Sequence, residues 1–159
     1  MLKIKIISVG KLKEKSLKEL IAEYEKRMGR YAQFEICEIN DVFVPQNPSN
    51  SEINDILEKE ADEIIKKISP KAYIVSMCIE GKKLDSVRFS SLISDCSMNY
   101  PEINFIIGSS HGISDRIKNM SNFKLSMSDM TFPHNLARLM LIEQIYRAFK
   151  ILANESYHK

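Results

Sequence analysis

Five polar side chains in the last quarter of the sequence are of types that can move a proton or stabilise a negative charge. They are His134, Arg147, Tyr157, His158 and Lys159. An imidazole can take up a proton near neutral pH, and a guanidinium can hold a phosphate or a developing anion. Simpler roles exist, because His134 could merely cap a helix or pack in the core, and Arg147 could merely pair with Glu143, four residues earlier on the same helix face. Both interpretations stay open on these residues alone.

The segment Gly108–Gly112, with the sequence Gly-Ser-Ser-His-Gly, follows a short apolar run and contains a candidate serine nucleophile. It satisfies G-x-S-x-G, the pattern of the nucleophile elbow in α/β-hydrolases. Ser110 would then need a later acid and, after it, a later base. The chain offers Asp115 or Asp129 followed by His134 or His158. Because the chain is short for that fold and lacks an upstream oxyanion segment, a serine hydrolase is kept only as an alternative function.

The two glycines of this segment also permit a different use. A backbone without side chains can approach a ligand closely and leave its amides free to bind it, which suits a nucleoside-like cofactor. The dinucleotide pattern G-x-G-x-x-G and the Walker A lysine pattern are both absent. A tight turn between a strand and a helix would produce the same residues with no ligand.

Apolar periodicity along the chain predicts strands that alternate with helices. The expected strands cover about residues 2–9, 34–39, 73–79, 103–107 and 123–127. The expected helices cover about 15–28, a segment from an N-cap at Ser51 to the residue before Pro70, a segment around 89–93 that ends before Pro101, and about 133–152. This order predicts one α/β domain over residues 1–159, with a mostly parallel sheet flanked by helices and ligands beyond the carboxyl ends of its strands.

The composition is that of a single globular unit. The 159 residues are 44% hydrophobic and 28% charged, with five Gly and five Pro, which excludes collagen-like and disordered chains. No apolar run approaches the ~20 residues that cross a bilayer, so we expect neither a membrane span nor a secretory signal. Three widely spaced cysteines without a CxxC pair argue against a disulfide framework or a cysteine metal site. Cysteines without disulfide partners are expected in a reducing compartment such as the cytoplasm.

Charge is unevenly distributed along the sequence, although the net charge is only +2. Residues 1–30 hold nine Lys or Arg against four Glu, residues 31–110 hold seven against thirteen acids, and residues 111–159 hold seven against four. If the two basic ends meet in the fold, they form a face that attracts phosphates. Otherwise these charges are ordinary solvated surface.

Several blocks of the sequence together resemble one family over essentially the whole chain. They are Ile6–Lys13 (IISVGKLK), Ala22–Arg27 (AEYEKR), Leu125–His134 (LSMSDMTFPH), Glu143–Ala148 (EQIYRA) and Glu155–Lys159 (ESYHK). With them, the chain resembles the bacterial ribosomal RNA methyltransferase H family of the SPOUT (α/β-knot) superfamily. The resemblance implies a C-terminal trefoil knot and transfer of a methyl group, without a metal, from S-adenosylmethionine to N3 of a pseudouridine in 23S ribosomal RNA.

The resemblance also implies which residues bind the cofactor. The matching positions lie in three C-terminal loops and are Met77, Gly108, Met127, Ser128, Asp129, Met130, Thr131 and Phe132. The apolar side chains of Met77, Met130 and Phe132 would enclose the adenine ring, although each could equally be core packing. The family usually has glycine where this chain has Ser109, so Ser109 must adopt a backbone conformation that is open to other residues.

The remaining implications concern catalysis and partners. His134 would handle the N3 proton or position the substrate, Arg147 would hold a phosphate or the developing imide charge, and the last three residues would cap an active site, which could be that of another subunit. The helix over 133–152 is apolar nearly all round in its first half, which predicts a homodimer interface. The expected substrate is the assembled ribosome, recognised by shape. A non-catalytic RNA-binding module with the same fold is the other alternative.

Overall fold

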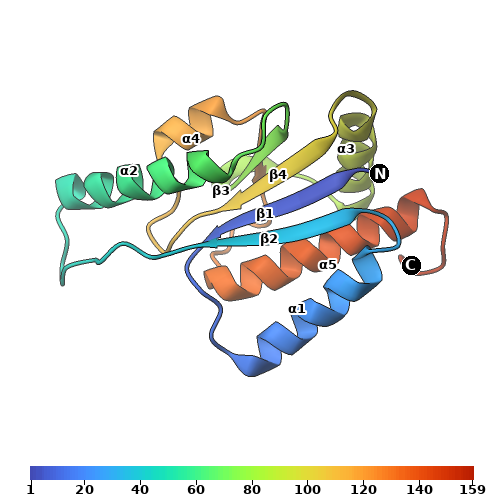
Figure 1. Ribbon diagram of the computed structural model, residues 1–159, viewed down its shortest axis with the longest axis horizontal. Helices are drawn as coiled ribbons and strands as arrows, with labels where there is room; N and C mark the ends of the chain where they lie inside the picture. The colour runs from blue at the N-terminus through green and yellow to red at the C-terminus, as the bar shows by residue number, and fades with distance from the viewer.

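The computed structural model describes all residues, 1–159, as five strands and five helices that alternate along the chain (Figure 1). The strands are β1 (Lys3–Val9), β2 (Gln33–Ile39), β3 (Tyr73–Lys83), β4 (Glu102–Ile107) and β5 (Phe123–Ser126). The helices are α1 (Lys15–Met28), α2 (Asn50–Lys67), α3 (Ser86–Asn99), α4 (Asp115–Met120) and α5 (His134–Leu152). No helix combines the length and the apolar character needed to cross a bilayer.

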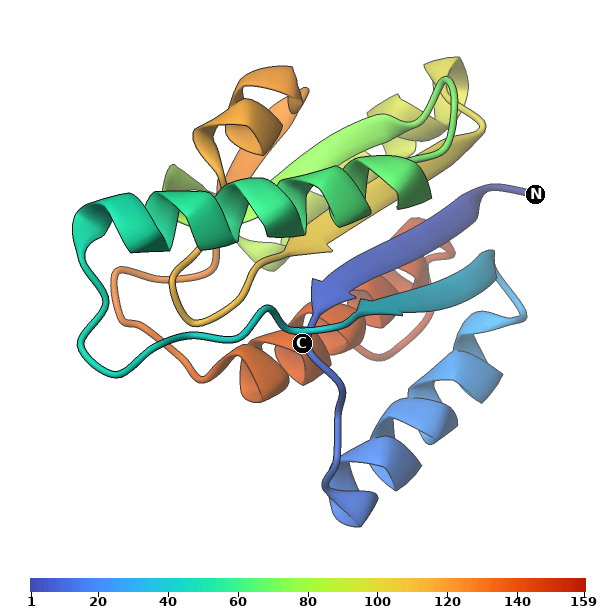
Figure 2. The same ribbon diagram turned by 60° about the vertical axis from the view of Figure 1, so that its left-hand side comes forward.

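The five strands form one sheet in the order β2-β1-β4-β3-β5, and every neighbouring pair is parallel. The predicted α/β fold with a mostly parallel sheet is therefore confirmed. Because all strands run the same way, the loops that follow them gather at one edge of the sheet, here called the carboxyl edge, as Figure 2 shows. The trefoil knot stays a prediction.

Helices cover both faces of the sheet in two unequal layers (Figure 1). On one face, α1, α3 and α5 pack over a core cluster of 20 buried residues, to which β1 contributes Ile4 and Ile6. On the other face, α2 and α4 cover a cluster of nine, to which β1 contributes Ile7 and Val9. Both faces of β1 are therefore buried along most of its length, as expected for a central strand of a parallel sheet.

Helix α2 begins two residues before the predicted position. Its N-cap is Ser49 rather than Ser51: the Ser49 hydroxyl accepts a hydrogen bond from the Glu52 amide, and the Glu52 carboxylate accepts one from the Ser49 amide. This reciprocal pair is a capping box, which requires a Glu or Gln three residues after the cap. Ser51 has Asn54 at that position, so the correct cap could have been read from the sequence.

Strand β3 also differs from its prediction, because it continues past Gly81 to Lys83 instead of ending at Ile79. Its pairing with β5 is interrupted by a register shift between Met77 and Lys82. A Cβ atom on Gly81 would lie only 2.7 Å from the backbone carbonyl of Lys124 in β5. The glycine therefore lets two backbones touch where a side chain would separate them. The short helix α4 was not predicted.

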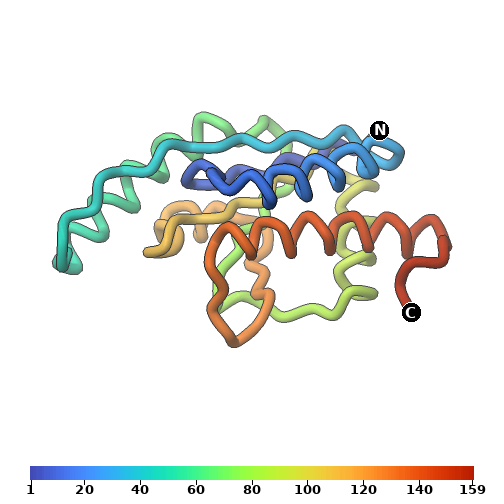
Figure 3. Tube along the Cα trace, turned by 90° about the horizontal axis from the view of Figure 1, so that it is seen from below, coloured from blue at the N-terminus to red at the C-terminus, as the bar shows by residue number.

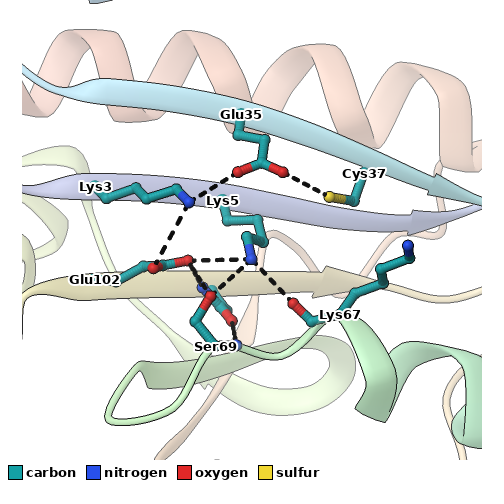
Figure 4. A network of polar contacts seen from close by, with 8 residues as sticks. Lys3, Lys5, Glu35, Cys37, Lys67, Ser69 and Glu102 are labelled. Atoms are coloured by element: carbon teal, nitrogen blue, oxygen red, sulfur yellow. Dashed lines mark hydrogen bonds and ion pairs between the residues drawn. The ribbon is translucent and has the colours of Figure 1, made fainter.

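The face of the sheet under α2 also holds a buried polar network, drawn in Figure 4. The Lys5 ammonium donates to Ser69 Oγ (2.7 Å) and to the carbonyl of Lys67 (3.0 Å), and lies 3.4 Å from Glu102 Oε1. Burial alone would raise the pKa of the Glu102 carboxyl, but hydrogen bonds from Ser69 and Asn104 and the charges of the lysines lower it. The network joins the amino-terminal ends of β1 and β4 to the end of α2.

Candidate active site

A cleft of about 720 Å³ opens at the carboxyl edge, among the end of β3, the loop after β4 and the segment between β5 and α5. We call it the edge cleft. Seven of the eight predicted cofactor residues line it: Met77, Gly108, Met127, Ser128, Met130, Thr131 and Phe132. His134, the first residue of α5, lines it as well. The structure thus brings together residues that are up to 57 positions apart in the sequence.

Asp129 is the predicted cofactor residue that does not line the edge cleft. Its carboxylate forms an exposed ion pair with the Lys83 ammonium at 2.6 Å. The turn around it is shaped by serines, because the Ser126 hydroxyl donates to the Ser128 carbonyl and the Ser128 hydroxyl accepts from the Met130 amide. Such side-chain to backbone bonds hold turns in place of a regular ladder. Asp129 therefore lies on the outer side of the segment between β5 and α5, away from the cleft.

The loop after β4 is a tight turn that depends on both of its glycines. A Cβ atom on Gly108 would lie 2.2 Å from the carbonyl oxygen of Gly112, and Gly112 itself has a φ of +94°. The Gly112 amide donates to the Ser109 carbonyl at 2.9 Å, which closes the turn. Ser109 does not have a positive φ, so a non-glycine residue fits there as expected.

The serine-hydrolase arrangement is absent from this loop. Ser110 is exposed, and its hydroxyl makes no hydrogen bond to a histidine or a carboxylate. The neighbouring Ser109 is the serine that bonds, and its partner is Glu60. The match to G-x-S-x-G thus follows from the turn chemistry of the two glycines and needs no nucleophile.

The other catalytic candidates gather at the end of α5, where the chain turns back along the helix (Figure 3). We call Glu143, Arg147, Tyr157 and His158 the tail cluster. The Arg147 guanidinium lies 2.7 Å from Glu143 Oε1 and 3.2 Å from His158 Nδ1, and its carbon is 4.8 Å from the centre of the Tyr157 ring. The Tyr157 hydroxyl donates to the same Glu143 oxygen at 3.2 Å. Arg147 therefore has both the pairing with Glu143 and contact with the tail.

Electrostatics decide what the tail cluster can do near neutral pH. Burial, reinforced by Tyr24 and Glu143, raises the pKa of Tyr157 to about 12. The hydrogen bond from Arg147 to Glu143 raises the pKa of the guanidinium as well. Tyr157 is therefore a protonated donor and no base, and Arg147 is always charged. His158 is the exposed member of the cluster.

His134 lies far from the tail cluster within one chain. It and Arg147 stand thirteen residues apart on the same straight helix, which corresponds to about 20 Å at 1.5 Å per residue. The His134 side chain makes no hydrogen bond, and the residue in the N-cap position of α5 is Pro133. The helix-capping alternative for His134 therefore finds no support. Lys159 is exposed at the end of the chain.

A second groove of about 810 Å³, lined mostly by hydrophobic residues, lies among α1, α3 and α5. We call it the helix groove. Leu20 on α1, Val87 on α3 and Met140 on α5 line it and are 44%, 51% and 37% exposed. The groove shares part of its wall with the edge cleft, including Met77, and His158 lies at its border.

Sequence reasoning missed Arg138, which fastens the start of α5 to the sheet. Its side chain is 2% exposed, and its guanidinium donates to Glu38 Oε2 (2.8 Å), Ser8 Oγ (2.9 Å) and the Gly10 carbonyl (3.0 Å). Burial raises the pKa of the Glu38 carboxyl, but the bonds from Arg138 and from the Leu12 amide outweigh it and lower the pKa. The available signal was the one arginine within the apolar first half of the helix. Its bonds hold His134, one turn earlier, against the carboxyl edge.

Comparisons with known proteins agree with this geometry. A family model described as "Predicted SPOUT methyltransferase" matches residues 2–158. The chain is 48% identical over 159 residues to the ribosomal RNA large subunit methyltransferase H of Streptococcus suis, covering 99% of this chain and 100% of that protein. It is 47% identical over 157 residues to the protein of the same name from Clostridium botulinum, covering 98% and 99%.

A solved structure shows the same fold at low sequence identity. The tRNA (m1G37) methyltransferase from Aquifex aeolicus superposes with a TM-score of 0.50 and 16% identity, over 92% of this chain and 69% of that one. The family model and both relatives cover nearly the whole chain. The chain belongs to the SPOUT methyltransferases and, among them, to the ribosomal RNA large subunit methyltransferase H family.

Proposed function

We propose that this protein transfers a methyl group from S-adenosylmethionine to N3 of a pseudouridine in 23S ribosomal RNA of the assembled ribosome. The observation that carries the proposal is the edge cleft, which gathers seven of the eight residues expected to hold the methyl donor in a chain that matches its relatives from end to end. The preference for pseudouridine over uridine comes from the family alone.

The residues of the edge cleft fit S-adenosylmethionine. The cleft has the size of a small-molecule site, for which about 300 to 1,000 Å³ is usual. Gly108 lets the turn close on itself, because a Cβ there would collide with the Gly112 carbonyl. Gly112 lines the cleft with open space at its Cβ position, so a ligand can approach the main chain closely there. Met77, Met130 and Phe132 offer apolar surface for an adenine ring, and Met130 is 74% exposed, as a residue that closes over a ligand would be.

The chemistry asks the protein for alignment and for control of one proton. S-adenosylmethionine supplies a methyl group on a positively charged sulfur that is its own leaving group, so no metal is required. Positioning of the two reactants can account for about 7 to 11 kcal/mol of the barrier. The acceptor N3 carries a proton near neutral pH, and a base that removes it makes the nitrogen nucleophilic. We assign this role to His134, which lines the cleft without a hydrogen-bond partner of its own.

Arg147 would stabilise the negative charge that develops on the imide or hold a neighbouring phosphate. Its distance from His134 along α5 means that the two cannot serve one acceptor within a single chain. A homodimer resolves this, because the tail cluster of one subunit can face the edge cleft of the other. The exposed apolar side chains of the helix groove supply a surface for such an interface.

The RNA would be held by the basic beginning of the chain. Helices α1 and α5 pack against each other, so the two basic ends do meet. The cations of α5, however, are paired with Glu38, Glu143 and Glu155. Exposed lysines without an ion pair include three in the β1–α1 loop and the start of α1: Lys11, Lys13 and Lys18. They can bind phosphates of a preformed ribosomal surface in the cytoplasm.

Mass spectrometry of 23S ribosomal RNA from cells with and without the gene tests the function. We expect one methylated pseudouridine to disappear in the deletion strain and to return with the wild-type gene. The variants His134→Ala and Arg147→Ala should fail to restore it while still binding S-adenosylmethionine. An unchanged modification pattern, with RNA binding that needs no cofactor, would instead support the non-catalytic RNA-binding alternative.

A further inference from the structure

Glu60 of α2 is a buried carboxylate directly behind the edge cleft. Its residue is 3% exposed, and its Oε1 accepts a hydrogen bond from the Ser109 hydroxyl at 2.8 Å. No lysine or arginine forms an ion pair with it, and burial raises the pKa of its carboxyl. Burying a carboxylate without an ion pair is unfavourable for folding. We therefore ask what its one hydrogen bond, to Ser109, does for the protein.

Ser109 connects this carboxylate to the loop that lines the cleft. Among the residues of Gly108–Gly112, Ser109 alone forms a side-chain hydrogen bond, and that bond leads to another element. The other bond at this residue, from the Gly112 amide to the Ser109 carbonyl, stays inside the turn. The glycines give the turn its shape, and the Ser109 hydroxyl supplies its side-chain hydrogen bond to another element.

Helix α2 is a firm support for such a tie, because it is also bonded to the segment beyond the loop. Glu58 accepts from the Ser114 hydroxyl at 2.5 Å, and Asp62 pairs with Arg116 at 2.7 Å. Glu58 and Asp62, one turn apart on one face of α2, therefore receive the start of α4. Glu60, on a different and buried side of the helix, receives Ser109, which lines the edge cleft.

We propose that Glu60 is a positioning residue that holds the loop Gly108–Gly112 in its ligand-binding shape through the Ser109 hydroxyl. The proposal rests on the proposed function in one respect, that the ligand of this loop is S-adenosylmethionine. It assigns to the Ser109 hydroxyl a tie that a glycine at this position could not make. Glu60 touches neither methyl donor nor acceptor, so its effect is on cofactor affinity and not on the chemical step.

Calorimetric titration of the full-length protein with S-adenosylmethionine tests this role. We expect Ser109→Ala and Glu60→Ala each to weaken binding by about threefold to tenfold, the effect of one lost hydrogen bond. Glu60→Gln keeps an oxygen acceptor and should bind almost as wild type. In the double variant Ser109→Ala/Glu60→Ala, the loss should equal that of one single variant, because both remove the same bond.

Ser114→Ala is the matched control, since it removes a serine-to-glutamate bond on the same helix whose serine does not line the cleft. It should leave cofactor affinity unchanged. In methylation assays, the Ser109 and Glu60 variants should raise the KM for S-adenosylmethionine and keep the wild-type kcat. If Glu60→Ala does not fold, as judged by thermal unfolding, Ser109→Ala carries the test alone.

Two negative results are distinguishable. Wild-type affinity in Ser109→Ala and Glu60→Ala, or an equal loss in Ser114→Ala, overturns the role of Glu60. Failure of the wild-type protein to bind S-adenosylmethionine refutes the proposed function instead.

Discussion

Lys5 shows how a single residue can be essential to the fold while lying far from the chemistry. It is 8% exposed and shares its surroundings with Glu102, also 8% exposed (Figure 4). Replacing Lys5 leaves the buried Glu102 charge with its hydrogen bonds from Ser69 and Asn104 and only the more distant Lys3 ammonium, 4.0 Å away, to balance it. We therefore expect Lys5→Met to lower the free energy of unfolding at pH 7 by about 3 kcal/mol, measured by urea denaturation. Lys3→Met is the control: the Lys3 ammonium pairs with the partly exposed Glu35 at 2.9 Å and lies farther from Glu102, at 4.0 Å, so it should contribute about 1 kcal/mol or less.

The same pair predicts a pH dependence with a definite sign. The pKa of Glu102 is lower in the folded protein than its ordinary value of 4.5, so its contribution to stability is present above that value and is lost as the pH falls through the folded pKa. In Lys5→Met the carboxyl loses a nearby positive charge and takes up a proton at higher pH. The stability deficit of the variant should therefore shrink between pH 7 and pH 4. A deficit that is constant over this range would show that Glu102 is not the group responsible.

At the scale of elements, the sequence predicted the helices and strands that depend on neighbouring residues. It did not predict features that depend on contacts between segments far apart in the chain. The spacing of apolar residues was sufficient to predict the existence of all five strands and of four of the five helices. The passage of β3 beyond Gly81 was not predictable, because its cause is the backbone of β5 more than 40 residues later. Arg138 and Glu60 were missed for the same reason, since their partners come from other elements. The cleft residues were found through the family pattern, and no rule of spacing alone would have joined Met77 to Phe132.

The contributions of the C-terminal tail to the stability of the protein and to its activity can be measured separately. Tyr157 packs edge-on against Tyr146, with ring centres 5.2 Å apart, and is bonded to Glu143, whereas His158 and Lys159 are exposed. Ending the chain after Tyr157 should leave the free energy of unfolding within about 0.5 kcal/mol of wild type and reduce the methylation rate. Tyr157→Ala should reduce both. Thermal unfolding and turnover on ribosomes, measured on the same samples, check this. Loss of stability equal to the loss of activity in the shortened chain would make the tail structural.

The whole molecule must be larger than one chain if His134 and Arg147 act on one nucleotide. Met140→Glu, in the exposed apolar surface of α5, should then give monomers in light scattering, without methylation activity but with retained secondary structure in circular dichroism. A charge at the centre of an apolar interface opposes association, whereas on a solvated surface it costs little. Lys13→Glu, on the exposed β1–α1 loop, is the control that should stay dimeric.

Mixing two inactive variants distinguishes a shared active site from two independent ones. When His134→Ala and Arg147→Ala proteins are unfolded together and refolded, about half of the dimers contain one chain of each. If each active site takes His134 from one subunit and Arg147 from the other, every mixed dimer has one site with both residues intact and one with neither. Activity should then return to roughly a quarter of the wild-type rate. If both residues act within one chain, every site keeps one defect and no activity returns. A mixture that stays inactive while light scattering and mass spectrometry show mixed dimers would therefore exclude the shared site and, with it, the assignment of His134 and Arg147 to one reaction.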